Sequence, residues 1–150
     1  MAIVFHNIPK ENFPQKMVLK RCLKALSEKY GKKVGSLHYV MVGDDELLEM
    51  NKTYLGHDYY TDIITFDQSD NLKKLEGDIY ISSDRVEENG QKFGNGPTRE
   101  YLRVCCHGLL HLCGLKDKTP AEQLKMRAAE DEGIALYENL LKEISIKPGI

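Results

Sequence analysis

The feature that most constrains this chain is one strongly apolar segment that carries two histidines. Residues 98–117 read TREYLRVCCHGLLHLCGLKD. On a helix with about 100° per residue, every position from 101 to 113 is apolar, Cys or Gly except Arg103, His107 and His111. These three polar residues fall on one stripe, because they are spaced four residues apart. We therefore predict a helix over residues 98–112 that is buried against a sheet and stops at Gly114.

The remaining chain alternates between strand and helix patterns. Short β-rich runs predict strands at 2–6, 34–42, 62–66 and 77–82. Helical spacing of apolar residues, with Asp44, Ser83 and Thr119 as expected N-caps, predicts helices at 13–30, 44–54 and 84–93 and a last one from Pro120. The runs at 62–66 and 77–82 fit either a hairpin or sheet neighbours joined by a long loop.

Four strands interleaved with helices predict the α/β class, arranged as an α+β sandwich. We expect a four-stranded mixed sheet packed against the buried helix that carries the histidines, with further helices around it. The sequence contains no internal repeat, low-complexity tract or Pro/Gly/Ser linker. Residues 1–150 are therefore expected to form a single domain.

Composition limits where the chain works and what it binds. No window approaches 18 consecutive apolar residues, and the first residues lack an export signal, so a cytoplasmic protein without membrane contact is expected. The four cysteines include no CxxC pair, which disfavours a thiolate zinc ribbon and favours core packing. The net charge is −2, so any RNA-binding surface must be local.

The histidine pair and the residues after it have the spacing of a metal site. His107 and His111 lie one turn apart, where two imidazoles can share one ion. Gly114 can end the helix in a left-handed turn and return the chain, which brings Asp117 to the same ion. Three protein ligands leave a fourth position for water, as in catalytic zinc sites, so one divalent ion, zinc, is the expected cofactor. The alternative is two hydrogen-bonded core histidines beside a loop acid.

The same spacing, HxxxHxxGxxD, is similar to the long zinc signature of metzincin peptidases. Those enzymes use a Glu directly after the first histidine as the general base. Here Gly108 stands in that place and cannot transfer a proton. Standard peptidase chemistry is therefore disfavoured.

Longer motifs carry a resemblance to a known family. The run HGLLHLCG at 107–114 closely resembles the H-G-x-L-H-L-x-G core of the YbeY family, bacterial endoribonucleases that mature ribosomal RNA. The runs NKTY at 51–54 and TDIITF at 61–66 resemble its N-x-x-Y and T-D-V-L-S-F stretch. GDIYIS at 77–82 resembles its G-D-I-x-I-S strand, and Met126 and Glu130 match its last helix. The resemblance spans about residues 40–140.

The resemblance implies a four-stranded α/β fold, a bound zinc-like metal and cleavage of single-stranded RNA. It also implies work on ribosomal RNA 3′ ends and in ribosome quality control, with ribosomal components as partners. The chain departs from the family at two places. Asp117 stands where the family usually has a third histidine, and Leu55 stands where it usually has an arginine thought to serve catalysis.

The missing arginine directs attention to Arg103. This residue lies one turn before His107 on the same face, within reach of a phosphate held at the metal, so it is the candidate phosphate contact. Its alternative role is a salt bridge to Glu100, three residues earlier.

Three functions remain open from the sequence. The first is a metal-dependent endoribonuclease that acts on ribosomal RNA precursors. The second is a metal-dependent hydrolase of another bond, including an atypical zinc peptidase. The third is a ribosome-associated binding protein in which the metal only stabilises the fold.

Overall fold

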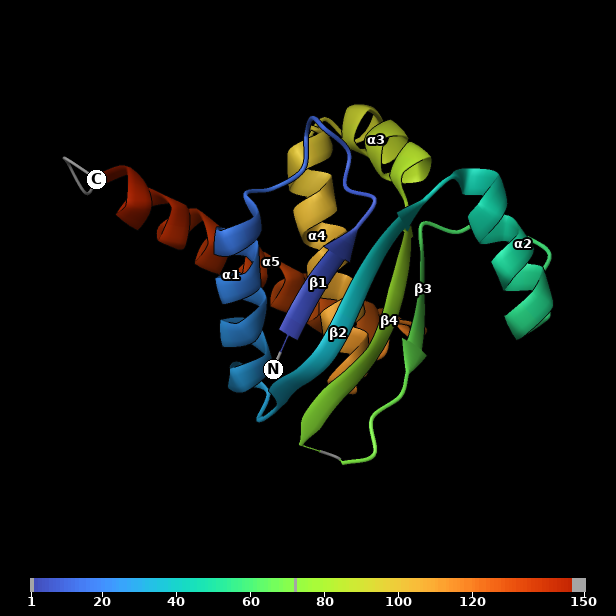
Figure 1. Ribbon diagram of the computed structural model, residues 1–150, viewed down its shortest axis with the longest axis horizontal. Helices are drawn as coiled ribbons and strands as arrows, with labels where there is room; N and C mark the ends of the chain where they lie inside the picture. The colour runs from blue at the N-terminus through green and yellow to red at the C-terminus, as the bar shows by residue number, and fades with distance from the viewer. Residues whose placement is uncertain (1, 72, 147–150) are drawn as a thin grey trace.

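The computed structural model describes residues 2–71 and 73–146 (Figure 1). The strands are β1 (Ala2–His6), β2 (Lys33–Val42), β3 (Ile63–Asp67) and β4 (Lys74–Ser82). The helices are α1 (Lys16–Lys29), α2 (Asp44–Leu55), α3 (Ser83–Lys92), α4 (Pro97–Leu112) and α5 (Pro120–Ile146). Within this described part of the chain, no helix is long and apolar enough to cross a membrane.

The strands form one mixed sheet in the order β1-β2-β4-β3. β2 pairs in parallel with β1 on one side and with β4 on the other, whereas β3 runs antiparallel to β4. The predicted α/β class with a four-stranded mixed sheet is confirmed. The third and fourth predicted strands, β3 and β4, are antiparallel neighbours in the sheet. The loop that joins them follows Asp67 and ends before Lys74.

Helix α4 is buried as the sequence predicted, behind the sheet in Figure 1 together with α5. Its apolar side chains, including the fully buried Leu109 and Leu110, belong to the main hydrophobic core. Gly108 lets the helix approach the sheet closely, because a Cβ there would lie 2.9–3.0 Å from the side chains of Ile63 and Ile79. The depth of α4 is thus fixed by side chains of β3 and β4.

Several helix ends differ from the sequence prediction by a residue or more. α1 begins at Lys16 instead of Phe13, because Pro14 disfavours helical backbone at the residue before it. Gln15 is its N-cap, and the Gln15 side chain accepts a hydrogen bond from the Val18 amide at 2.8 Å.

The start of α5 agrees with the prediction. The capping box is present, since Thr119 and Glu122 exchange side-chain-to-amide hydrogen bonds.

Two other N-caps were predicted one residue too late. Gly43, and not Asp44, is the N-cap of α2, and the Asp44 carboxylate instead pairs with Arg85 at 2.9 Å. Ser82, and not Ser83, caps α3 through its hydroxyl, which accepts from the Arg85 amide at 3.1 Å. In both cases a contact with another element takes the side chain that local spacing had assigned to a cap, because the Ser83 hydroxyl donates to the carbonyl of Val42 at the end of β2 at 3.3 Å.

Gly133 permits the crossing of α5 over α1 and α4, and this generates a stability prediction. A Cβ at this position would lie 2.6 Å from Cys106 Sγ and 3.0 Å from Leu26 Cδ2. We expect Gly133→Ala to lower the free energy of unfolding by about 1–3 kcal/mol, because the helices must separate. Urea denaturation measures it.

The sign of the change separates packing from helix propensity. At an exposed helical site Gly→Ala raises stability by about 1 kcal/mol. The exposed Ala135, two residues further on, provides a matched control, because Ala135→Gly reports propensity alone. A gain of stability in Gly133→Ala would show that α5 does not pack as closely as described.

Candidate metal centre

His107, His111 and Asp117 come together at the C-terminal end of α4. The Nε2 atoms of His107 and His111 each lie 3.3 Å from Oδ2 of Asp117. One ligand atom from each residue lies within 4.8 Å of the others, so the group can hold a metal ion. The three side chains are partly exposed, at 20%, 29% and 38%. No other group of three such residues occurs within residues 2–71 and 73–146.

The turn after α4 brings the third residue to the pair. The two histidine rings are one turn apart and meet edge to face, with centroids 4.5 Å apart. Gly114 then adopts a left-handed backbone with φ of +104°, and the amide of Leu115 donates to the carbonyl of Leu110 at 3.0 Å. This ends the helix and turns the chain back, as the spacing predicted.

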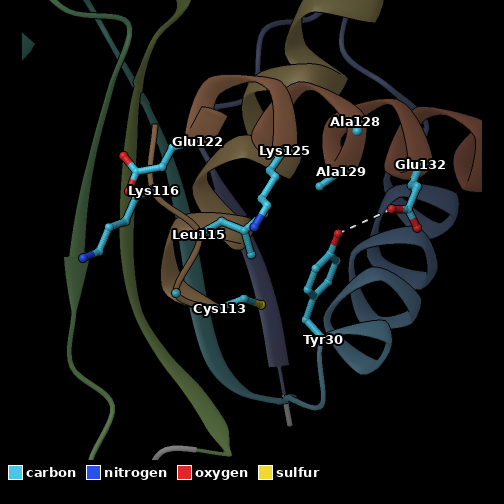
Figure 2. Close-up of a pocket in the computed structure, with 10 residues that line it drawn as sticks. Tyr30, Cys113, Leu115, Lys116, Glu122, Lys125, Ala128, Ala129 and Glu132 are labelled. Carbon is cyan, nitrogen blue, oxygen red and sulfur yellow. Dashed lines mark hydrogen bonds between the residues drawn. The ribbon is translucent and has the colours of Figure 1, made fainter. Parts of the chain in front are cut away.

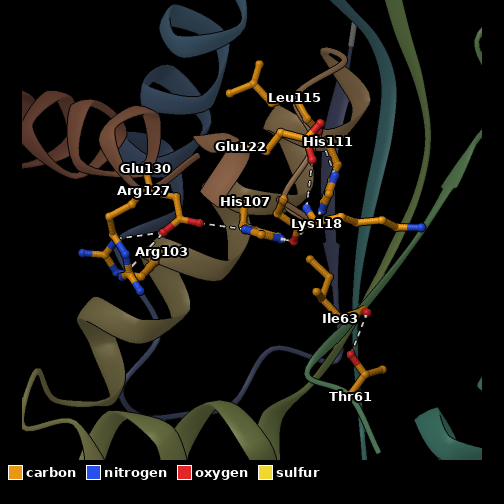
Figure 3. A network of polar contacts seen from close by, with 11 residues as sticks. Thr61, Ile63, Arg103, His107, His111, Leu115, Lys118, Glu122, Arg127 and Glu130 are labelled. Carbon is orange, nitrogen blue, oxygen red and sulfur yellow. Dashed lines mark hydrogen bonds and ion pairs between the residues drawn. The ribbon is translucent and has the colours of Figure 1, made fainter. Parts of the chain in front are cut away.

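Each histidine is held by a hydrogen bond to its other ring nitrogen. Nδ1 of His107 is 2.7 Å from Oε2 of Glu130, and Nδ1 of His111 is 3.0 Å from the carbonyl oxygen of Leu115 (Figure 3). A carbonyl oxygen only accepts, and a carboxylate accepts as well, so both Nδ1 atoms carry the proton and donate. In the neutral form of each ring, Nε2 then keeps the lone pair that a metal ion requires, and both Nε2 atoms lie 3.3 Å from Oδ2 of Asp117.

Arg103 lies behind Glu130, on the side away from His107 (Figure 3). Its Nη1 donates to Oε1 of Glu130 at 2.8 Å, and its Nη2 donates to Asp131 at 3.0 Å. The side chain is 13% exposed. The ion pairs therefore join α4 to α5, and they replace the pair with Glu100 that the spacing had suggested. The phosphate contact assigned to Arg103 from the sequence remains a prediction.

Charge around the centre sets the protonation of its buried groups. Burial alone would raise the pKa of Glu130, but hydrogen bonds from His107 and Arg103 lower it overall. Burial alone would lower the pKa of His107, but the hydrogen bond and charge of Glu130, with Asp117 and Asp62 nearby, raise it overall. Glu130 thus stays ionised and Arg103 balances its charge.

A hollow of about 300 Å³ opens onto the group and contains residues that the sequence did not single out. From the loop before β3 come His57, Tyr59 and Asp62, and burial raises the pKa of the Asp62 carboxyl. A carboxyl of this kind is suited to proton transfer. The full lining consists of Asn51, Leu55, His57, Tyr59, Thr61, Asp62, Ile63, Ile64, Thr65, His107, His111 and Asp117.

The signal for Asp62 was present in the sequence. It belongs to the run TDIITF that carried the resemblance, although no chemistry was assigned to it. His57 lies in an irregular loop, and no other histidine stands near it in the sequence. Only the approach of the loop to α4 brings it to the hollow.

A larger hollow, of about 560 Å³, lies beyond the turn at Gly114 and has different chemistry (Figure 2). Cys113 lines it, and burial raises the pKa of this thiol to about 11, so it is protonated at neutral pH and a poor nucleophile. Across the hollow the Tyr30 hydroxyl donates to Glu132 at 3.4 Å. The smaller hollow, which holds both histidines and Asp117, is therefore the candidate functional site.

The fold and this group define a small α/β protein with a His-His-Asp group that could hold a metal ion, and comparison with known proteins gives the family. The family model described as Endoribonuclease YbeY matches residues 5–138. A protein named Endoribonuclease YbeY from Phocaeicola vulgatus is 47% identical over 114 residues, which cover 76% of this chain and 82% of its relative. One of the same name from Porphyromonas gingivalis is 39% identical over 133 residues, covering 88% and 87%.

A solved structure agrees with the fold. The solution structure of TM1509 from Thermotoga maritima matches with a TM-score of 0.66 and 25% sequence identity, over 99% of both chains. Because the family model covers most of the sequence and curated relatives exceed 40% identity over three quarters of it, this chain belongs to the endoribonuclease YbeY family. The resemblance read from the motifs is confirmed.

The buried ionic contacts of Glu130 generate a prediction about stability. Glu130→Gln should lower the free energy of unfolding by about 2 kcal/mol, because Arg103 and His107 lose their charged partner in a buried place. The measurement is urea unfolding in the presence of a chelator, so that metal binding does not contribute.

The same helix offers a matched control. Glu138 pairs with Arg99 at 3.3 Å, and both side chains are about half exposed, at 51% and 46%. Glu138→Gln should cost less than about 1 kcal/mol, since an exposed ion pair contributes little. Equal losses in the two variants would mean that the Glu130 contacts are no stronger than surface pairs.

Proposed function

We propose that this chain is a single-strand-specific, metal-dependent endoribonuclease of the cytoplasm. Its substrates are ribosomal RNA precursors, cut near the 3′ end, and its partners are ribosomal components in maturation and quality control. One observation carries the proposal, namely two Nε2 atoms and one carboxylate oxygen that converge at the hollow. Membership of the endoribonuclease YbeY family supports RNA as the substrate.

The donor set fits zinc. Two atoms that each lie about 2.0–2.2 Å from a tetrahedral zinc ion are roughly 3.3–3.5 Å apart. The distance from either Nε2 to Oδ2 of Asp117 is 3.3 Å. Imidazole and carboxylate are both common zinc ligands, and three protein ligands leave a position for water or substrate. We therefore propose His107, His111 and Asp117 as the ligands of one zinc ion per chain.

The protein's own residues orient this set. When bound, zinc would supply Lewis acidity toward a phosphodiester and lower the pKa of a water molecule. Glu130 fixes the ring and the tautomer of His107, and the Leu115 carbonyl does the same for His111. Asp117 contributes a negative charge where a third histidine would contribute none, so the centre is less positive than a three-histidine site.

A phosphate at the centre needs a cation, and two arginines lie near it. Arg103 has both terminal nitrogens on carboxylates, which favours a role in holding Glu130. Arg127 on α5 is 61% exposed, and it lines a hollow of about 640 Å³ that also reaches His107 and Asp117. Its guanidinium is 3.7 Å from Glu130, a looser contact. We propose Arg127 as a second candidate for the phosphate contact.

The ligand assignment predicts the metal content. His107→Ala, His111→Ala and Asp117→Ala should each lose most of about one zinc ion per chain, since two ligands hold an ion poorly. Elemental analysis after purification checks this, and His38→Ala, on the sheet, is the control that should keep the metal. Full metal content in the Asp117 variant would place the third ligand elsewhere.

Cleavage assays separate the two arginines and the alternative functions. The metal-loaded protein should cut single-stranded RNA but not casein, and His111→Ala should abolish cutting.

Arg127→Ala should lower kcat/KM for RNA cleavage at least tenfold at full metal content, because the negative charge of the transition state loses its cationic partner. If Arg103 is the phosphate contact, Arg103→Ala shows that loss instead at full metal content, in addition to the lower melting temperature expected from its lost ion pair with Glu130. Cleavage of casein alone would point to a peptidase.

A further inference from the structure

The loop between α2 and β3 places two aromatic rings at the rim of the metal-centre hollow. His57 and Tyr59 both line this hollow together with His107, His111 and Asp117. Their rings are stacked, with centroids 5.1 Å apart and planes inclined by 18°. The hydroxyl of Tyr59 is 3.0 Å from Nδ1 of His57. Both residues are exposed, Tyr59 at 56%.

The backbone under the pair is firmly held. Gly56 ends α2 in a left-handed conformation with φ of +68°, and the His57 amide then donates to the carbonyl of Asn51 at 3.1 Å. The buried Asn51 side chain donates to the main-chain oxygen of Tyr59 at 3.0 Å. These contacts use main-chain atoms of the loop, so they orient both side chains without occupying either ring.

The next aromatic residue of the loop, Tyr60, has a structural role. The Tyr60 hydroxyl donates to Asp45 at 2.9 Å, and the Arg85 guanidinium lies over its ring at 5.3 Å. Tyr60 therefore ties the loop to α2 and α3. His57 and Tyr59 instead contact each other through their rings, and both line the hollow.

We propose that His57 and Tyr59 form a stacking platform for one unpaired base of the RNA strand whose phosphodiester lies at His107, His111 and Asp117. The proposal rests on the proposed endoribonuclease function and adds how a single strand is recognised. An unpaired base offers both of its faces, whereas a base in a duplex is already stacked on its neighbours. The platform selects by stacking, so it tolerates any base and prefers large purines.

A fluorescent reporter tests the contact directly. The sequence has no tryptophan, so Tyr59→Trp introduces a single indole at the platform. A 2′-O-methyl oligoadenylate, which resists cleavage, should quench this indole by stacking on it. Phe93→Trp, at the exposed end of α3, is the matched control and should show no quenching. Equal quenching at both positions, or none at Tyr59→Trp, would overturn the proposal.

A second experiment measures how much stacking contributes to the affinity. It compares binding of the same oligoadenylate with binding of an abasic oligomer of equal length and charge. Tyr59→Ala should weaken oligoadenylate binding at least fivefold, as expected for a lost stacking partner, and leave abasic binding unchanged. Tyr59→Phe keeps the ring and should bind like the parent, and Phe93→Ala should do so too. Equal weakening on both oligomers would mean that Tyr59 does not act through a base, and no weakening would exclude stacking; either result refutes the platform.

These measurements do not depend on turnover. If the protein cuts no RNA but Tyr59→Ala loses oligoadenylate binding selectively, the nuclease proposal falls and the platform stands. If the protein cuts RNA and Tyr59→Ala binds both oligomers like the parent, the platform falls and the nuclease proposal stands.

Discussion

The carboxylate of Glu130 connects the two helices that build the metal centre. One of its oxygens accepts from Arg103 and the other from His107 Nδ1, and the residue is 6% exposed. Since Nδ1 must donate, His107 can offer only Nε2 to the position that it shares with Asp117. The chemistry of the centre therefore depends on α5 lying close against α4, which the absence of a side chain at Gly133 permits.

The buried helix and the surface loop have different tasks at this site. The apolar face of α4 fixes the depth of the histidines against β3 and β4, so their positions follow from the core. The loop after α2 lies on the other side of the hollow and presents polar and aromatic groups, together with Leu55. Leu55 offers no charge to a phosphate. In the function proposed here, binding of an RNA strand relies on stacking on this loop and on an arginine of α4 or α5.

The centre was predictable where its geometry is local. His107, His111 and Asp117 follow from the helical period and from one glycine that can take a left-handed turn, so the sequence alone indicated the group. The partner of Arg103 was not predictable, because Glu130 and Asp131 come from another helix and the nearer Glu100 looked equally suitable. The same reason explains the shifted caps at Asp44 and Ser83, where contacts between elements override local spacing.

The order of elements and the four strands of the sheet were predictable from periodicity, because each strand and helix buries one face. His57 and Tyr59 were not, since a histidine in a polar loop has no period and its neighbours depend on where the loop lies. The sequence motifs alone indicated the family. Because Leu55 stands where the family usually has an arginine, the sequence left open which residue contacts the phosphate. The answer requires three-dimensional positions.

The most direct test of the central claim is a crystal structure of the zinc-loaded protein, with anomalous diffraction recorded at the zinc absorption edge. If His107, His111 and Asp117 are the ligands, one peak per chain should lie about 2.0–2.2 Å from Nε2 of His107, Nε2 of His111 and a carboxylate oxygen of Asp117. Glu130 should stay hydrogen-bonded to His107 Nδ1. A peak bound through Nδ1 of either histidine, or placed away from Asp117, would contradict the account.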